Sequence, residues 1–220
     1  MGSALAFPAR ENGNEVRLVG THLDREIIET SKKTNRHPKF VKDFPAGVQY
    51  FQIEELEGAL KGADLVIGGV SSFGVDWFGD FVLPKIPESI PVLSVTKGLM
   101  DTEDGKLLSY PEVWDARMKK LGKNMNLNAV GGPCTSYELV AHDQTEVAFC
   151  GDDIKTLSNL TKAIFNSIDI LSSILFIASF DNALNIIISS IRFINSGLKC
   201  SLISCITNSL LSSRTCSLPK

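Results

Sequence analysis

The chain has 220 residues, 44% of them hydrophobic and 21% charged, and a formal net charge of −3 at pH 7. This composition is that of an ordinary globular protein with room for one large domain or one domain with an appendage. The small negative charge gives no electrostatic case for binding nucleic acid or a membrane surface. The start of the chain has no basic secretory leader, and its five cysteines form no Cys-x-x-Cys pair, so we expect a reduced, cytoplasmic protein without a metal site.

The first part of the chain alternates between helix and strand patterns. We expect a helix over residues 3–11, a strand over 15–19, an amphipathic helix over 23–33, a strand over 48–53 and a helix over 54–61. An apolar strand over 64–70, a helix or turn over 73–82 and another apolar strand over 90–95 follow. That last strand is short and rich in β-branched residues, which is typical of an interior parallel strand.

Lys97 comes directly after this strand, in the run Ser94–Leu99. Ligands of open α/β sheets bind at the carboxyl ends of the strands. Lys97 is therefore either a solvated loop lysine or a positive charge directed into a cleft. Gly98 beside it allows the backbone to turn sharply and to approach a ligand closely.

The same alternation continues to about residue 166. A helix is expected over 111–121, a strand over 126–130, a helix over 135–142, a strand over 145–150 and a helix over 152–165. Repeated strand–helix units of this size predict an α/β fold with a doubly wound parallel sheet.

The composition changes after residue 166, where Ser, Ile, Leu and Asn dominate and glutamate, tyrosine and tryptophan disappear. We therefore predict one domain over residues 1–166 and a low-complexity apolar tail over 167–220. The tail could be aberrant, from a divergent or non-native reading frame, or a packed structural segment. Serine, asparagine and scattered charges interrupt each apolar run before the roughly 20 residues that a membrane span needs.

Several motifs, in order and in register, carry a family resemblance. They are Met1–Ala6 with Asn12–Leu18, Asn35–Pro38, Ala63–Ile67, Ser94–Leu99 and Gly132–Leu139. Together they resemble the N-terminal domain of NAD(P)-dependent glycerol-3-phosphate dehydrogenase over about residues 1 to 166. The resemblance implies a Rossmann-like domain whose first strand and first two glycines are missing, so that the sheet carries an unpaired edge or a gap.

The resemblance implies a nicotinamide cofactor, NADPH or NADH, with Met1, Gly2, Thr21, Lys97 and Ser136 as cofactor-binding residues. Gly2 matches the third glycine of the glycine-rich turn that lets a helix N-terminus meet the pyrophosphate. Thr21 is neutral where NAD-specific domains commonly place an acid, which permits NADPH. His22 or Arg17 could then contact a 2′-phosphate, or this segment is a loop without such a role.

The resemblance also implies that Lys97, Gly132 and Cys134 contact the substrate, with Lys97 as the catalytic-site lysine that touches both substrate and cofactor. Cys134 stands where the family usually has a hydroxyl residue, and a thiol is a poorer hydrogen-bond donor. We expect no nucleophilic role for it. We expect Glu138, in the same motif, to cap or pack a helix.

The reaction implied by the resemblance is reduction of dihydroxyacetone phosphate to sn-glycerol 3-phosphate, a phospholipid precursor. A lysine in an Ala-x-Lys-Asn helix of the family's C-terminal domain transfers the proton, and no Lys-Asn pair follows residue 166 here. We therefore expect a domain truncated at both ends, with activity absent or impaired.

Two alternatives remain open at this point. One is a non-catalytic nucleotide-binding or interaction module, in which the apolar tail could drive homo-oligomerisation. The other is a different dehydrogenase of the same superfamily, such as a ketopantoate reductase, although the Gly-Pro-x-x-x-x-Glu pattern argues against it.

Overall fold

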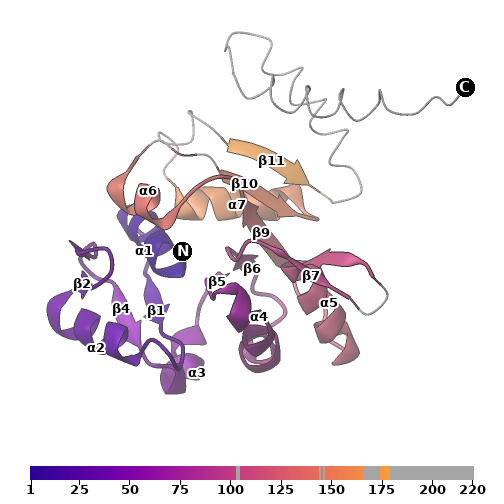
Figure 1. Ribbon diagram of the computed structural model, residues 1–220, viewed down its shortest axis with the longest axis horizontal. Helices are drawn as coiled ribbons and strands as arrows, with labels where there is room; N and C mark the ends of the chain where they lie inside the picture. The colour runs from indigo at the N-terminus through magenta and orange to yellow at the C-terminus, as the bar shows by residue number, and fades with distance from the viewer. Residues whose placement is uncertain (103–104, 144, 146, 166–173, 179–220) are drawn as a thin grey trace, which may run out of the picture. The chain divides into compact units, whose positions relative to one another are not determined.

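A computed structural model of the chain describes residues 1–102, 105–143, 145, 147–165 and 174–178 (Figure 1). By its internal contacts the chain divides into a unit of Met1–Ala183 and a unit of Leu184–Lys220, and the second unit lies outside the described residues. Of the predicted tail, only Ile174–Ala178 falls among the described residues, so the division at residue 166 stays a prediction.

A five-stranded sheet forms the centre of the first unit. Its strands, in spatial order, are β11 (Ile174–Ala178), β10 (Val147–Gly151), β9 (Leu127–Gly131), β6 (Val92–Ser94) and β5 (Val66–Gly68). The strands β5, β6 and β9 are parallel, and β6 is buried throughout. This arrangement confirms the predicted α/β class and the interior parallel strand before Lys97.

The sheet departs from a wholly parallel one at β10, which runs antiparallel to β9 and parallel to β11. The connection from β9 to β10 passes through the short helix α6 (Ser136–Ala141). This helix packs against the N-terminal helix α1 (Gly2–Glu11) rather than forming a crossover along the sheet. A parallel pairing of β10 with β9 would need a crossover.

Two further strands form a sheet of their own. The strands β1 (Arg17–Val19) and β4 (Gln49–Phe51) pair in parallel, and neither pairs with the five-stranded sheet among the described residues. Such a break is the consequence expected for a doubly wound sheet without its first strand. The helix α2 (Arg25–Thr34) packs against β4.

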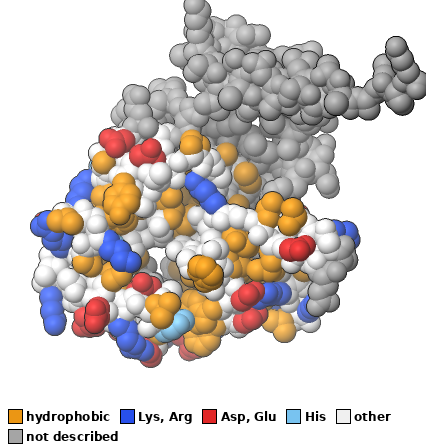
Figure 2. Space-filling model, in the orientation of Figure 1, with side chains coloured by type: hydrophobic (Ala, Val, Ile, Leu, Met, Phe, Trp, Pro, Cys, Tyr) orange, Lys and Arg blue, Asp and Glu red, His pale blue; other side chains and the backbone are white. Residues whose placement is uncertain are grey.

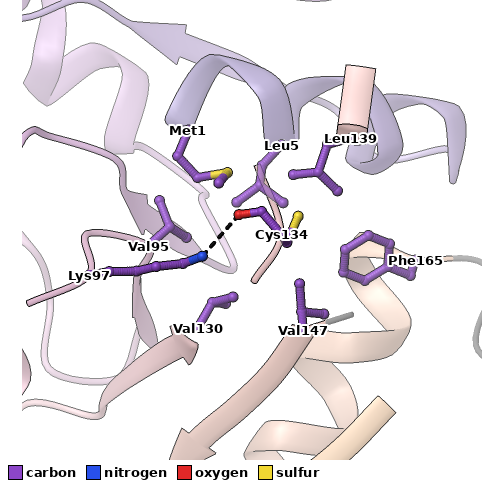
Figure 3. A pocket seen from close by; sticks show the side chains of 9 residues that line it. All are labelled: Met1, Leu5, Val95, Lys97, Val130, Cys134, Leu139, Val147 and Phe165. Carbon is purple, nitrogen blue, oxygen red and sulfur yellow. Dashed lines mark hydrogen bonds between the residues drawn. The ribbon is translucent and has the colours of Figure 1, made fainter. Parts of the chain in front are cut away.

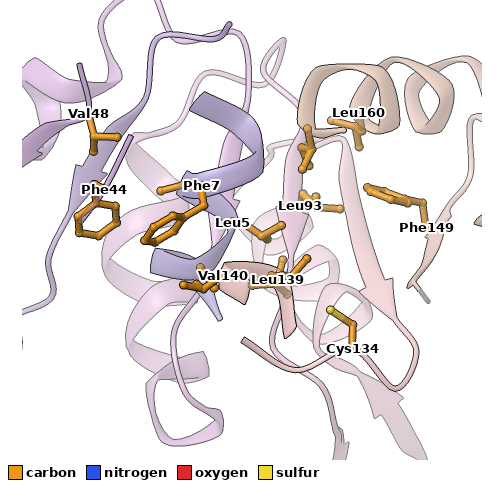
Figure 4. Close-up of a cluster of buried hydrophobic side chains, with 14 of the residues drawn as sticks. Leu5, Phe7, Phe44, Val48, Leu93, Cys134, Leu139, Val140, Phe149 and Leu160 are labelled. Atoms are coloured by element: carbon orange, nitrogen blue, oxygen red, sulfur yellow. The ribbon is translucent and has the colours of Figure 1, made fainter. Parts of the chain in front are cut away.

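Helices cover both faces of the five-stranded sheet (Figure 1). On one face α1, α6 and α7 (Ile154–Ile164) enclose a core that includes Leu93, Phe149 and Leu157 (Figure 4). The second core contains Val92, Trp114 and Met118, with residues of α4 (Val75–Trp77) and α5 (Tyr110–Lys120). Because Val92 and Leu93 are neighbours in β6, the two cores lie on opposite faces of the sheet.

The remaining elements are short. Residues 53–61 start as a 3-10 turn (Ile53–Glu55) before α3 (Leu56–Leu60), and Phe78–Val82 continues α4 as a π-helical turn between two 3-10 turns, Ser72–Gly74 and Leu83–Lys85. Two hairpins were not predicted: β2 (Arg36–His37) with β3 (Lys42–Asp43), and β7 (Leu99–Asp101) with β8 (Leu107–Ser109). None of the helices in the described part of the chain is long and apolar enough to cross a membrane.

Candidate functional site

Lys97 lies at the carboxyl end of β6 and is bound to the loop that follows β9. Its ammonium group donates hydrogen bonds to the main-chain oxygen of Gly132 and, at 2.9 Å, to that of Cys134 (Figure 3). The structure thus brings together the three residues that the sequence predicts at the substrate. An ammonium group has three donors, so one remains for a further acceptor.

The backbone around Lys97 is fixed by its neighbours. The Thr96 hydroxyl donates a 2.6 Å hydrogen bond to the main-chain oxygen of Val70, which ties the end of β6 to the loop after β5. Gly98 has φ +145°, and a Cβ atom there would lie 2.5 Å from the Tyr110 hydroxyl oxygen. The predicted sharp turn therefore both needs glycine and uses its small size.

Cys134 takes part in this contact through its main chain alone. Its side chain is buried, and the sulfur points away from Lys97 (Figure 3). Burial raises the pKa of the Cys134 thiol. Since the thiolate is the reactive form, this environment suits a packing role rather than a nucleophile.

The helix α6, which follows Cys134, begins with a capping box. The Thr135 hydroxyl accepts from the Glu138 N–H at 3.3 Å, and the Glu138 carboxylate accepts from the Thr135 N–H at 2.6 Å. That second bond is the main reason why the pKa of Glu138 is lowered. The predicted capping role of Glu138 is confirmed.

A cavity of about 650 Å³ lies beside this loop, and the other predicted cofactor residues, Met1, Gly2, Thr21 and Ser136, all line it. Lys97 lies outside that lining but shares a smaller hollow with Met1 and Cys134 (Figure 3). Met1 therefore borders both spaces and connects the two groups of predicted residues.

The N-terminus of α1 faces this cavity through Met1, Gly2 and Ser3. No side chain caps the helix, and the main-chain N–H groups of its first turn have no partner within the helix. Such a helix end carries partial positive charge and suits a phosphate group. The backbone comes close here, since a Cβ atom on Gly2 would lie 3.0 Å from the Cα of Gly69. A helix end with polar Thr21 and Ser136 in one cavity fits part of a dinucleotide.

The two cationic candidates for a 2′-phosphate differ in their surroundings. Arg17 donates hydrogen bonds to the main-chain oxygens of Ala59 (3.0 Å) and Lys61 (2.6 Å). It also lies at the start of β1, whereas Thr21 follows the end of that strand, so the structure does not place Arg17 at the predicted position. His22 is exposed beside Thr21, with its ring centroid 5.5 Å from that of Trp77.

The sequence interpretation missed a row of aromatic side chains after β5. Phe73 is 99% exposed, and the rings of Trp77 and Phe81 stack with centroids 5.6 Å apart. The spacing of four residues between these aromatics was the available signal, although residues 73–82 were predicted only as a helix or turn. Figure 2 shows exposed hydrophobic side chains lying between positive and negative ones on this face.

Solved structures share the fold of this chain. The glycerol-3-phosphate dehydrogenase of Coxiella burnetii matches with a TM-score of 0.62 at 17% identity, over 79% of this chain and 50% of that one. The enzyme of Plasmodium falciparum matches with a TM-score of 0.63 at 15% identity, over 80% of this chain and 48% of that one.

Sequence comparisons identify the family. The NADP(+)-dependent glycerol-3-phosphate dehydrogenase of Archaeoglobus fulgidus is 36% identical over 76% of this chain and 48% of its own length. The glycerol-3-phosphate dehydrogenase [NAD(P)+] of Leuconostoc citreum is 29% identical over 80% of this chain and 54% of its own length. The chain thus spans about half the length of these relatives, and neither alternative interpretation is favoured. A family model, NAD-dependent glycerol-3-phosphate dehydrogenase N-terminus, matches residues 1–157, and the chain belongs to that family.

Proposed function

We propose that this chain is the cofactor-binding half of an enzyme that reduces dihydroxyacetone phosphate to sn-glycerol 3-phosphate in the cytoplasm, as a supply of phospholipid precursor. The observation that carries the proposal is the position of Lys97. Its ammonium group is held by two carbonyl oxygens at the end of β6, next to a cavity that the α1 N-terminus enters.

The residues that would hold NADPH or NADH are Met1, Gly2, Thr21 and Ser136, which line one cavity. The first turn of α1 would bind the pyrophosphate through main-chain N–H groups, and the hydroxyl side chains would bind other polar groups of the cofactor. When bound, the reduced nicotinamide supplies a hydride for the carbonyl carbon of the substrate.

Lys97 would orient the substrate and stabilise negative charge on it. The two carbonyl oxygens fix the ammonium group before a ligand arrives, so little reorganisation is needed when it meets a phosphate or carbonyl oxygen. Lys97 need not give up a proton in this role. The carbonyl oxygen must still receive one proton when the hydride adds, and no residue predicted here supplies it.

We therefore propose that the 220-residue chain binds its ligands without completing the reaction. The test is a titration of the purified chain with sn-glycerol 3-phosphate in the presence of NADPH, followed by two-dimensional NMR, which detects weak binding. We expect Lys97→Met to weaken binding of the phosphate ligand at least tenfold, because it removes the positive charge.

Lys120→Met is the matched control, since Lys120 is exposed at the end of α5, and it should bind like the unsubstituted chain. Equal binding by both variants would refute the role of Lys97. Oxidation of NADPH by dihydroxyacetone phosphate above background would refute the proposal that the chain does not turn over.

A further inference from the structure

The strands β1 and β5 each have one unpaired edge among the described residues. In β5, the Val66 N–H donates to Pro91 O at 3.1 Å, and Gly68 O accepts from the Val95 N–H at 3.0 Å. Both bonds point toward β6. Because alternate residues of a strand direct their main-chain groups to opposite edges, the N–H and C=O of Ile67 point the other way.

The same reasoning identifies the open edge of β1. The Gly20 N–H donates to Phe51 O at 3.0 Å, and Val16 O accepts from the Gln49 N–H at 2.9 Å. Residues 16, 18 and 20 therefore face β4, and the main-chain groups of Arg17 and Val19 face away from it. Unpaired edges of this kind are templates for another strand.

The two open edges border the same cavity of about 650 Å³. Val16–Val19 of the β1 segment and Leu65–Ile67 of the β5 segment both line it. Further lining comes from helices of both layers, including Ala6 of α1 and Leu56 of α3. The space between the edges is therefore bounded as an interior position of a sheet would be, with strands at its sides and helices above and below.

The side chains at these edges are apolar on both faces. Leu18 and Ile67 pack against the first core, and Val19 and Val66 pack against the second. A strand placed between them would be covered on both faces, and such strands are near-continuous apolar runs. At the ends of the space, Asp64 precedes β5, whereas Gly20 and Gly69 follow β1 and β5. This pattern favours a basic residue before the strand and a small residue after it.

We propose that the space between β1 and β5 is an acceptor site for one extended apolar peptide strand of about five residues, a length typical of strands. The inserted strand pairs with Val19 on one side and Ile67 on the other, and it joins the two sheets into one. Main-chain hydrogen bonds provide the affinity, as in other cases of strand addition. The inference goes beyond the proposed reaction and needs neither substrate nor cofactor.

The test adds a synthetic peptide, Lys-Lys-Val-Ala-Val-Ile-Gly, blocked at both ends, to the full chain. Hydrogen exchange followed by NMR measures the amides of Val19 and Ile67. We expect saturable 1:1 binding, at least tenfold slower exchange at these two amides, and a higher Tm. The control peptide has proline at the central valine, which removes a ladder donor and fits only at sheet edges.

Equal effects of the two peptides would overturn the proposal, because they would reflect nonspecific apolar binding. Slow exchange at Val19 and Ile67 before any peptide is added, with no peptide binding, would also overturn it. That outcome would mean that the chain's own tail or a second copy already occupies the space, which light scattering would distinguish. Loss of NADPH binding would leave these readouts unaffected, so the two proposals fail separately.

Discussion

Lys97 gains its position from contacts that involve no other functional side chain. Two main-chain oxygens hold its ammonium group, and Thr96 and Gly98 fix the backbone on either side of it. The site is therefore built from backbone geometry, and substitutions that alter the backbone near residue 97 should matter as much as loss of the charge.

Gly98→Ala should destabilise the fold by about 2–4 kcal/mol, because it combines a positive φ with a clash against the Tyr110 hydroxyl. Urea unfolding followed by circular dichroism measures the change. Gly122→Ala is the control: Gly122 has φ +72° but no atom within 4 Å of a new Cβ, so only the conformational cost of about 1 kcal/mol is expected. Equal losses would show that Tyr110 does not restrict residue 98.

His37 should make stability depend on pH in a definite direction. Burial lowers its pKa below the ordinary 6.5, and its Nδ1 accepts from the N–H groups of Lys39 and Phe40, which requires the neutral ring. The unfolded chain therefore binds the proton first as pH falls, so stability should decrease from about pH 7 toward pH 5.

Urea unfolding at pH 7.5, 6.5 and 5.5 measures the effect of His37. In His37→Asn the side-chain oxygen can still accept the loop N–H groups, but it does not titrate. This variant should lose less stability over the same range than the unsubstituted chain. An identical pH profile would assign the effect to other groups.

At the scale of elements, α1 and α7 are joined through the ends of both helices. The side-chain amide of Asn12 donates to the main-chain oxygens of Lys162 (2.7 Å) and Ala163 (2.9 Å), and that of Asn14 donates to Ala163 O at 2.5 Å. These carbonyls belong to the last turn of α7, where the helix supplies no partner. The loop after α1 thus caps α7 from about 150 residues away in sequence.

Asn12→Ala should destabilise the fold by about 1–2 kcal/mol, since it leaves carbonyl groups of α7 without their donors. Urea unfolding gives the size of the effect, and hydrogen exchange should show faster opening of the last turn of α7. Asn124→Ala serves as the control, because the main-chain N–H of exposed Asn124, not its side chain, makes the printed bond to Glu88. A comparable loss in both variants would argue against the capping role.

The sequence predicted those elements whose signal is local. The strand before Lys97 is a short apolar run, and the capping box at Thr135 needs only Glu138 three residues later. The hairpins β2–β3 and β7–β8 have strands of two or three residues, too short to show a period. The reversed direction of β10 depends on the packing of α6 against α1, and the partners of Lys97 are main-chain oxygens, which leave no mark in the sequence.

For the unit of residues 1–183, the division into two sheets implies unequal stability. The strand β6 is paired on both sides, whereas β1 has only β4 as a neighbour. Regions with fewer pairings open at lower free energy than the global fold. Local opening near β1 would also disturb Thr21, which follows that strand and lines the cavity.

Amides of β1 and β4 should therefore exchange with solvent at least tenfold faster than amides of β6 and β9 under native conditions. Hydrogen exchange followed by NMR on the full chain measures both groups in one sample. The ratio should shrink when denaturant makes global unfolding the common route of exchange. Uniform protection in all four strands without denaturant would contradict this expectation.

The contact between Gly2 and Gly69 restricts which sequences can adopt this fold. A side chain on Gly69 would place its Cβ 2.3 Å from the Cα of Gly2, so each glycine is limited by the backbone of the other. In a library with every amino acid at both positions, neither column should tolerate a replacement. No compensating pair should arise either, because shrinking one residue cannot make room when both already have no side chain.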